Sequence, residues 1–353
     1  MSSKSNRTSA ERRQMARENR KLVKAYEKEL HRTRYTRSEF VARMKNDENV
    51  LEVDNLHTHF VRDSGTVRAV DGVSFDVPRG KIVGLIGEKG SGKSVTSLSI
   101  MQLLERPEGI IADGAIRLRL KDDQVVDIAA MPLQEIDAIR GSAIAMVTDE
   151  PTSSLHPVFM VGDQLDEVIG SEHLELGDEE IREKSLQVLR QVKIANAEEV
   201  YNMYPSQLST GMRQRVSLAI ALAGEPSVII LDEPTRSLDV TLQAQIVDLL
   251  RALNEEISTS MIYITNDLGD VAVLCDYVGV MHSGRVVERG TTAEIFQTPA
   301  HPYTEALLDP LLNTGQNTDR LYSFPEDLAD RDNEYLNDDV EMEQLSETHY
   351  VAR

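Results

Sequence analysis

The middle of the chain holds three short apolar runs that are separated by helical stretches. The runs are KIVGLIG at 81–87, SVIILDEP at 227–234 and MIYITND at 261–267. Such runs are typical of parallel strands that are buried on both faces of a sheet. The pattern therefore predicts an α/β fold with a mostly parallel central sheet.

A different pattern precedes the first of these runs. From Val50 onward, the segments VLEVDNLHTHF and VRAVDGVSFDV alternate apolar and polar residues and contain Asp-Gly and Pro-Arg-Gly turn signals. This period of two indicates antiparallel strands. Residues 178 to 222 have helical patterns with few strand signals. We therefore expect an antiparallel β layer, then the parallel sheet with a helical insert at about 155 to 225.

The two ends of the chain are polar and differ in charge. Residues 9 to 44 lack Gly and Pro and predict an exposed helix, while residues 326 to 353 hold ten acids and two arginines and predict a weakly ordered tail. The helix has a narrow apolar stripe that would dock on a partner or an anionic lipid surface, unless the segment is a solvated arm. The stripe consists of Met15, Leu22, Val23, Tyr26 and Leu30.

Charge and composition exclude several classes of function. The 353 residues carry a net charge of −21, which opposes binding to nucleic acid, and aromatic residues are 5% with no Trp. The charge is uneven, because residues 1 to 48 carry +7. The single Cys275 excludes disulfide frameworks, multi-cysteine zinc sites and cysteine-ligated clusters. Neither a run of 18 apolar residues nor a secretory signal is found, so we expect an internal protein unless a partner holds it at a membrane.

The strongest chemical signal follows the first apolar run. Residues 87 to 94 spell GEKGSGKS, which matches the phosphate-binding loop G-x-x-x-x-G-K-[ST] between a predicted strand and a predicted helix. Backbone N–H groups of such a loop point at phosphate oxygens, Lys93 reaches the β- and γ-phosphates of ATP, and Ser94 ligates Mg²⁺. The predicted ATP-binding residues are Gly87, Glu88, Lys89, Gly90, Ser91, Gly92, Lys93 and Ser94.

An acidic pair ends the second apolar run. Asp232 is placed to hold Mg²⁺, and the adjacent Glu233 is placed to orient and deprotonate an attacking water. An apolar run ending in Asp-Glu is by itself also an ordinary strand end. Together with the phosphate loop, it predicts the second half of a nucleotide-hydrolysing site.

The order of the remaining motifs resembles a known family. The phosphate loop, LSTGM at 208–212, LDEP at 231–234 and SLD at 237–239 resemble the nucleotide-binding subunit of an ABC transporter. VRAVDGVSF, MRQRV, LDVTLQAQIVDLL and HPYTEALL are similar, more narrowly, to the ATPases of oligopeptide, dipeptide and nickel importers. The resemblance covers roughly residues 50 to 312. It implies an ABC-type P-loop core, with an antiparallel β subdomain and a helical subdomain.

The resemblance implies domains and further site residues. It divides the chain into a basic helical extension (1–48), an ABC nucleotide-binding domain (49–312) and an acidic tail (313–353). Two such domains pack head to tail, so that Ser209, Thr210 and Gly211 face the partner's ATP. Asp239 and Gln207 fit positions at the dimer interface, with helix and turn capping as the alternative. Phe60 is placed to stack on adenine, unless it is a core residue. Relatives often carry cluster-ligating cysteines in the tail, and this tail has none, so we expect no iron–sulfur cluster.

Three positions depart from the family pattern around the γ-phosphate. Asp149 stands where relatives have Gln, and its carboxylate can ligate Mg²⁺ but repels phosphate. Asn266 replaces the switch histidine, so it donates a hydrogen bond but carries no charge. Thr210 replaces the first glycine of the LSGG-type segment and crowds the approach to phosphate. Either these changes are harmless in a working ATPase or they impair hydrolysis.

These observations lead to one preferred function and two alternatives. We expect an ATPase that energises a peptide importer at the cytoplasmic face of the membrane, with a different ATPase subunit, two permease subunits and, indirectly, an extracellular solute-binding protein. The first alternative is a regulatory subunit that clamps ATP with little hydrolysis, or an importer of nickel or another small solute. The second is a soluble ABC protein acting on ribosomes or DNA, which the acidic charge and the HPYTEALL segment disfavour.

Two weaker signals have mainly structural interpretations. His57 and His59 fall on one face of a predicted strand, but the sequence offers no third metal ligand at a suitable spacing. We therefore interpret them as strand residues. Cys275, within DVAVLCDYVGVM, is expected to be a small buried hydrophobic residue.

Overall fold

The computed structural model describes residues 9–149, 154–312 and 342–353. A smaller sheet contains β1 (Asn49–Arg62), β2 (Gly65–Pro78), β4 (Gly109–Arg119) and β5 (Val125–Asp127). A larger sheet contains β3 (Ile82–Ile86), β6 (Ile144–Val147), β7 (Val228–Asp232), β8 (Ser260–Ile264), β9 (Tyr277–His282), β10 (Arg285–Thr291), β11 (Met342–Gln344) and β12 (Tyr350–Ala352). The α-helices are α1 (Ser9–Leu30), α2 (Lys93–Ile100), α3 (Leu133–Ile139), α5 (Val161–Glu172), α6 (Asp178–Gln191), α7 (Ala197–Tyr201), α8 (Thr210–Ala223), α9 (Val240–Ile257), α10 (Leu268–Leu274), α11 (Thr292–Gln297) and α12 (Pro302–Leu312).

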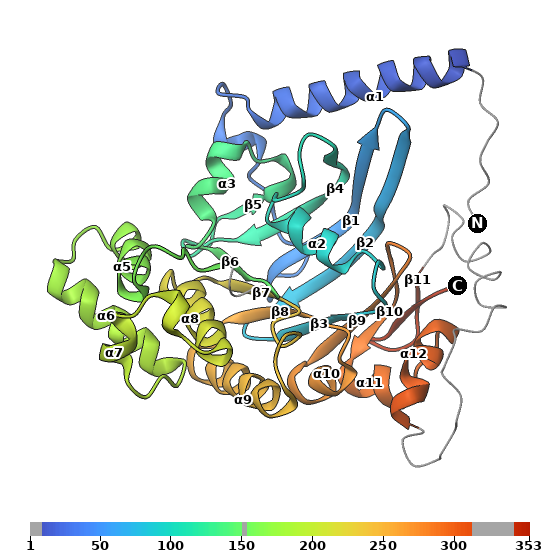
Figure 1. Ribbon diagram of the computed structural model, residues 1–353. Helices are drawn as coiled ribbons and strands as arrows, with labels where there is room; N and C mark the ends of the chain where they lie inside the picture. Colours follow the sequence, from blue (N-terminus) through green and yellow to red (C-terminus); the bar gives the residue numbers. More distant parts are fainter. Residues whose placement is uncertain (1–8, 150–153, 313–341) are drawn as a thin grey trace.

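The two sheets have different topologies. The smaller sheet is antiparallel, in the order β2-β1-β4-β5, and we call it the β lobe. The larger sheet has the order β11-β12-β10-β9-β3-β8-β7-β6, and its strands from β9 to β6 are parallel. Figure 1 shows the β lobe above the larger sheet, helices α8 to α11 beneath it, and α5 to α7 extending to one side. The predicted α/β class, with its β and helical subdomains, is confirmed.

The central strands are apolar throughout because both of their faces are covered. All five residues of β3, β7 and β8 are buried. In β7, Val228 and Ile230 pack into the core shared with the β lobe, whereas Ile229 and Leu231 pack into the core on the side of α8 and α9. Alternate side chains of a strand point to opposite faces, so one continuous apolar run serves two cores.

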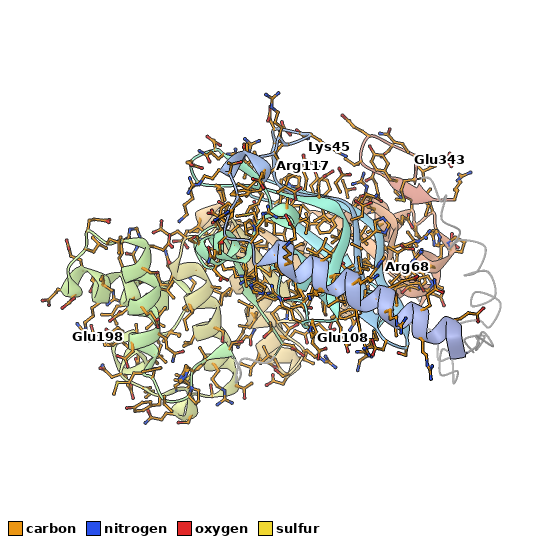
Figure 2. The ribbon with its side chains drawn as sticks, turned by 90° about the horizontal axis from the view of Figure 1, so that it is seen from above. Lys45, Arg68, Glu108, Arg117, Glu198 and Glu343 are labelled. Carbon is orange, nitrogen blue, oxygen red and sulfur yellow. The ribbon has the colours of Figure 1, made fainter. Side chains whose placement is uncertain are left out.

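The N-terminal helix is shorter and less solvated than expected. It ends at Leu30, and the segment from there to β1 holds turns and a 3-10 turn at Arg37–Glu39. Leu30 is buried, Tyr26 packs against the core of the β lobe, and Asn19 Nδ2 donates to the Arg62 carbonyl at 2.7 Å. The end of the apolar stripe at Tyr26 and Leu30 is therefore covered by the chain's own β lobe, whereas Leu22 is 49% exposed. Figure 2 shows α1 lying across this lobe, with Glu198 and Glu343 at opposite ends of the molecule.

The expectation of a weakly ordered end was wrong for residues 342–353. β11 and β12 form a hairpin, and β12 pairs with the edge strand β10. Glu288 on β10 is fully buried, and its Oε1 lies 2.7 Å from His349 Nε2 of the hairpin. The sequence pattern missed this pairing because an edge strand recruits a distant segment through tertiary contacts. The rest of the predicted tail, 313–341, lies outside the described residues.

Candidate active site

The phosphate loop has its shape imposed by neighbouring strands. It joins the end of β3 to the start of α2, and Gly87 and Gly92 have φ angles of 145° and 104°. A Cβ at Gly87 would lie 2.1 Å from the Met281 carbonyl oxygen, and one at Gly92 would lie 2.7 Å from the Ala69 carbonyl oxygen. Glycine is required at both positions, because any side chain would displace the loop from β9 or β2.

Lys93 opens α2 and folds back across its own loop. Its side chain is buried, and Nζ donates to the carbonyl oxygens of Gly87 at 2.6 Å and Glu88 at 2.9 Å. Nζ also donates to Asn266 Oδ1 at 3.0 Å. Burial lowers the pKa of Lys93, against the opposing effect of nearby carboxylates. An ammonium group with neutral acceptors in a buried loop favours an anionic ligand such as phosphate.

The two predicted Mg²⁺ ligands of the core lie together. Asp232 ends β7 and is 8% exposed; its Oδ1 accepts from Ser94 Oγ at 3.2 Å, and its Oδ2 accepts from Ser97 Oγ at 2.9 Å. Burial raises the pKa of Asp232, and the charges of Glu233 and Asp149 add to this effect. A hydroxyl and a carboxylate beside further carboxylates form a donor set that fits Mg²⁺. When bound there, the ion would neutralise phosphate charge.

Glu233 is held by its backbone and by two side chains. Its φ of 49° is left-handed, and its N–H donates to the Ile264 carbonyl at 2.8 Å. Its carboxylate accepts from Asn266 Nδ2 at 2.8 Å and pairs with Arg236 at 3.1 Å. Asn266 thus links Lys93 to Glu233, so one of the predicted departures lies at the centre of the site.

Asp149, at the end of β6, completes this group through Arg236. Asp149 Oδ2 lies 3.3 Å from Arg236 Nη1, the same nitrogen that contacts Glu233. We call Asp149, Asp232, Glu233, Arg236 and Asn266 the carboxylate cluster. Sequence reasoning missed Arg236, although its place three residues after Glu233, in TRSLDV, was a usable signal.

The remaining predicted residues lie around the starts of two other helices. Ser209 caps α8, where its Oγ accepts from the Met212 N–H at 3.3 Å, and Thr210 is the first residue of that helix. Gly211 is buried, and a Cβ there would lie 3.2 Å from Leu242 Cδ2. Asp239 caps α9 by accepting from two N–H groups at 3.0 Å. Within one chain these residues have capping and packing roles and do not bond to the phosphate loop.

The C-terminal region supports the loop through a residue that sequence reasoning missed. The backbone N–H of Glu88 donates to the hydroxyl of Tyr303 at 3.0 Å. Tyr303 is 3% exposed, and its ring lies 4.1 Å from the His282 ring centroid. Tyr303 lies in the HPYTEALL segment, which indicated the family but not the contact with the phosphate loop. Phe60 is a different case, since its half-buried ring packs in the β lobe beside Gly109.

The histidine pair acquires a neighbour that the sequence did not indicate. β1 pairs with β2 so that His57 lies opposite Asp71, and His57 Nδ1 is 3.1 Å from Asp71 Oδ1. The other oxygen of Asp71 accepts from Arg285 at 2.8 Å, and Arg68 lies 3.9 Å away. Two guanidinium groups therefore already balance this carboxylate, which disfavours a cation. Cys275 is buried as expected, and burial raises its pKa.

A cavity of about 640 Å³ does not belong to this site. It is lined by residues that include Gly80, Ser227 and Ser260. These residues lie at the amino ends of the parallel strands, whereas the phosphate loop and Asp232 lie at the carboxyl ends. Ligands of open α/β sheets bind at the carboxyl ends, so the site is identified by its chemistry rather than by cavity size.

A phosphate loop beside a strand that ends in Asp-Glu defines a P-loop nucleotide-binding domain. Family models agree, because residues 70–236 match "ABC transporter" and residues 287–335 match "Oligopeptide/dipeptide transporter, C-terminal region". The oligopeptide transport ATP-binding protein AppD of Bacillus subtilis (strain 168) is 42% identical over 284 residues, which is 80% of this chain and 85% of AppD. The chain belongs to the ABC transporter family of ATP-binding proteins, as its motifs predict.

Other relatives define the extent of the match. The glutathione import ATP-binding protein GsiA of Escherichia coli (strain K12) is 43% identical over 279 residues, which is 78% of this chain and 45% of GsiA. The chain thus spans about half the length of GsiA. The structure of cbiO1 from Clostridium perfringens is 28% identical, has a TM-score of 0.60 and covers 71% of this chain and 92% of its own. The dimeric ABC cassette MJ0796, at 24% identity and a TM-score of 0.59 over 69% and 98%, shows the fold alone.

The described part of the chain contains no candidate for a membrane-spanning helix. No helix within residues 9–149, 154–312 and 342–353 combines sufficient length with sufficient apolar character.

Proposed function

We propose that this chain binds and hydrolyses ATP with Mg²⁺ and energises a peptide importer. The observation that carries the proposal is the contact between Ser94 and Asp232 at 3.2 Å, which joins the phosphate loop to the acidic strand end. AppD, by its name, serves oligopeptide transport, and GsiA serves glutathione import. Glutathione is itself a small peptide, so both names favour a peptide substrate over nickel.

Each predicted residue has a defined task in this proposal. Lys93 contacts the β- and γ-phosphates, while Ser94 and Asp232 hold Mg²⁺, with Asp149 beside them. Glu233 is the general base for the attacking water, and Asn266 orients Glu233 and donates to the γ-phosphate. The rest of the loop cradles the phosphates and Phe60 contacts adenine, while Ser209, Thr210, Gly211 and Asp239 face the partner's nucleotide.

The proposed assembly contains four subunits. Two permease subunits span the membrane, and this chain lies at the cytoplasmic face with a second ATPase that is a different protein. A self-paired dimer would place Asp149, Thr210 and Asn266 in both composite sites, whereas pairing with an unaltered partner leaves an intact switch histidine in one of them. An extracellular solute-binding protein delivers the substrate to the permeases.

A second candidate is a regulatory subunit that clamps ATP with little hydrolysis. One observation favours it: the carboxylate of Glu233 is already held by Asn266 at 2.8 Å and by Arg236 at 3.1 Å. A carboxylate that already engages two donors has fewer lone pairs available to take the proton of an attacking water.

The change Glu233→Gln in the assembled transporter separates the two candidates. If this chain's site hydrolyses ATP, we expect ATP binding to persist while turnover falls by about a hundredfold, since a general base contributes about 10²–10⁴. Phosphate release and calorimetric ATP binding are the measurements, with Glu183→Gln on the surface of α6 as the control. Unchanged turnover would contradict hydrolysis at this site and support the regulatory role.

A further inference from the structure

Arg236 lies at the point where the charge of the site is least favourable. Asp149, Asp232 and Glu233 place three carboxylates where the γ-phosphate is proposed to bind, and Lys93 is the buried cation of the loop. Asp149 is the one of these three carboxylates that departs from the family pattern. A carboxylate beside a phosphate oxygen repels it. Arg236 brings a second cation, and its Nη1 lies 3.3 Å from Asp149 and 3.1 Å from Glu233.

The pair joins segments that are distant along the chain. Asp149 follows β6, and Arg236 follows β7, which is the parallel neighbour of β6. Thr235 fixes the backbone just before Arg236, because Thr235 is buried and its hydroxyl donates to Asp270 Oδ2 at 3.1 Å. The backbone next to Arg236 is therefore held by a buried anchor, and the Arg236 guanidinium contacts Asp149 from that position.

Fold stability does not account for the pair. The side chains of Arg236 and Asp149 are 54% and 39% exposed, and ion pairs between solvent-exposed groups contribute little to folding. In contrast, a charge beside a bound polyanion acts directly on ligand affinity. The placement of Arg236 thus suits a role in nucleotide binding better than a structural role.

We propose that Arg236 is a positioning residue that neutralises Asp149, so that the Asp149–Arg236 pair replaces an uncharged side chain beside the γ-phosphate. This inference rests on the proposed nucleotide site. It explains how the chain keeps a carboxylate at position 149 without losing affinity for Mg·ATP. The requirement for Arg236 then exists only as long as residue 149 is acidic.

A double-mutant cycle on the assembled transporter tests this dependence. Arg236→Ser should raise the KM and the calorimetric Kd for Mg·ATP by about tenfold, because Asp149 is then uncompensated. Asp149→Gln combined with Arg236→Ser should return both constants to within about threefold of the wild type. Arg236→Lys should retain most of the affinity because the charge is kept. Arg79→Ser is the matched control, since Arg79 is 53% exposed and pairs with Asp123 at 2.9 Å, remote from the loop.

Three outcomes would overturn the proposal. If Arg236→Ser costs as much affinity in the Asp149→Gln background as in the wild type, Arg236 does not act through Asp149. If Arg236→Ser instead accelerates hydrolysis at unchanged Kd, Arg236 restrains Glu233 and does not neutralise Asp149. Should the serine variant fold poorly, the exchange Asp149→Arg with Arg236→Asp preserves the pair, and loss of its ATP binding would equally contradict the proposal. Retained ATP binding in Lys93→Ala would instead show that the nucleotide site itself is misassigned.

Discussion

The phosphate loop and the carboxylate cluster lie at the same edge of the sheet but are assembled differently. The loop is eight consecutive residues that run from the end of β3 into the start of α2, and the ammonium group of Lys93 bonds to the loop's own carbonyls. The cluster comes from the ends of β6, β7 and β8 and the turn after β7, and its charges meet only in three dimensions. The phosphate loop is therefore readable as a local motif, whereas the charge balance around the proposed γ-phosphate position is a tertiary property.

Burial differs between the inner groups of the site and the outer part of the carboxylate cluster. Lys93 of the loop is 5% exposed and Asp232 of the cluster is 8% exposed, while the Arg236 side chain is 54% exposed. Changes in the loop should therefore act strongly and on ATP affinity. Changes in the exposed part of the cluster should act more weakly and depend on one another.

The largest effect is expected from Lys93→Ala. Removing the ammonium group eliminates charge-assisted contacts to the β- and γ-phosphates, so Mg·ATP affinity should fall by about a hundredfold or more. Isothermal calorimetry on the full chain measures the loss. Lys184→Ala, on the helical subdomain, is the control with the same change in charge. If Lys93→Ala binds ATP normally, the loop is not the phosphate site.

A substitution at Asn266 is expected to raise the rate of ATP hydrolysis, whereas Lys93→Ala lowers the affinity for ATP. The amide bridges Lys93 and Glu233 but carries no charge, so Asn266→His should raise hydrolysis in the assembled complex by about tenfold, or about 1.4 kcal/mol of transition-state stabilisation. Steady-state phosphate release is the measurement. Flat turnover with intact ATP binding would show that the missing imidazole is not limiting.

A smaller effect is expected where the C-terminal region touches the loop. Tyr303→Phe removes the acceptor for the Glu88 N–H, a loss of about 0.5–1.5 kcal/mol for one hydrogen bond. Mg·ATP affinity should therefore fall by about threefold to tenfold at constant fold stability. Tyr350→Phe in the hairpin is the control, because its ring stacks on Arg289. Equal affinities in the two variants would mean that the loop needs no support from α12.

The smallest effect concerns a carboxylate remote from the phosphate chemistry. Burial raises the pKa of Glu294, but hydrogen bonds from Ser346, Thr291 and Thr348 outweigh it and lower that pKa to about 2. A depressed pKa stabilises the fold above the unfolded value of about 4.3, and this contribution is lost as pH falls toward 2. Glu294→Gln should lower the urea midpoint at pH 6 and by less at pH 3. A pH-independent difference would exclude ionisation as the source of stability.

The terminal segments show where sequence patterns fail. The sequence showed the apolar stripe of α1 but did not show that Tyr26 and Leu30 would pack on the β lobe. An apolar stripe indicates a surface suited to burial and does not identify the surface that buries it. Residues 342–353 looked like a solvated acidic end, yet β12 completes the edge of β10 and His349 meets the buried Glu288. Composition averages over a segment, while a single buried histidine–carboxylate contact and the pairing of an open strand edge depend on residues far apart in the sequence.

Local chemistry determined the phosphate loop, the buried strands and the family, because each depends on contiguous residues whose spacing fixes backbone conformation. Gly87, Gly92, Lys93 and the run ending at Asp232 were all assigned from such spacing. The contact of Arg236 with Asp149 and that of Tyr303 with Glu88 were decided only by the tertiary structure. Charges and hydroxyl groups act over a few ångströms in space, and the order of residues along the chain does not reveal which of them will be neighbours.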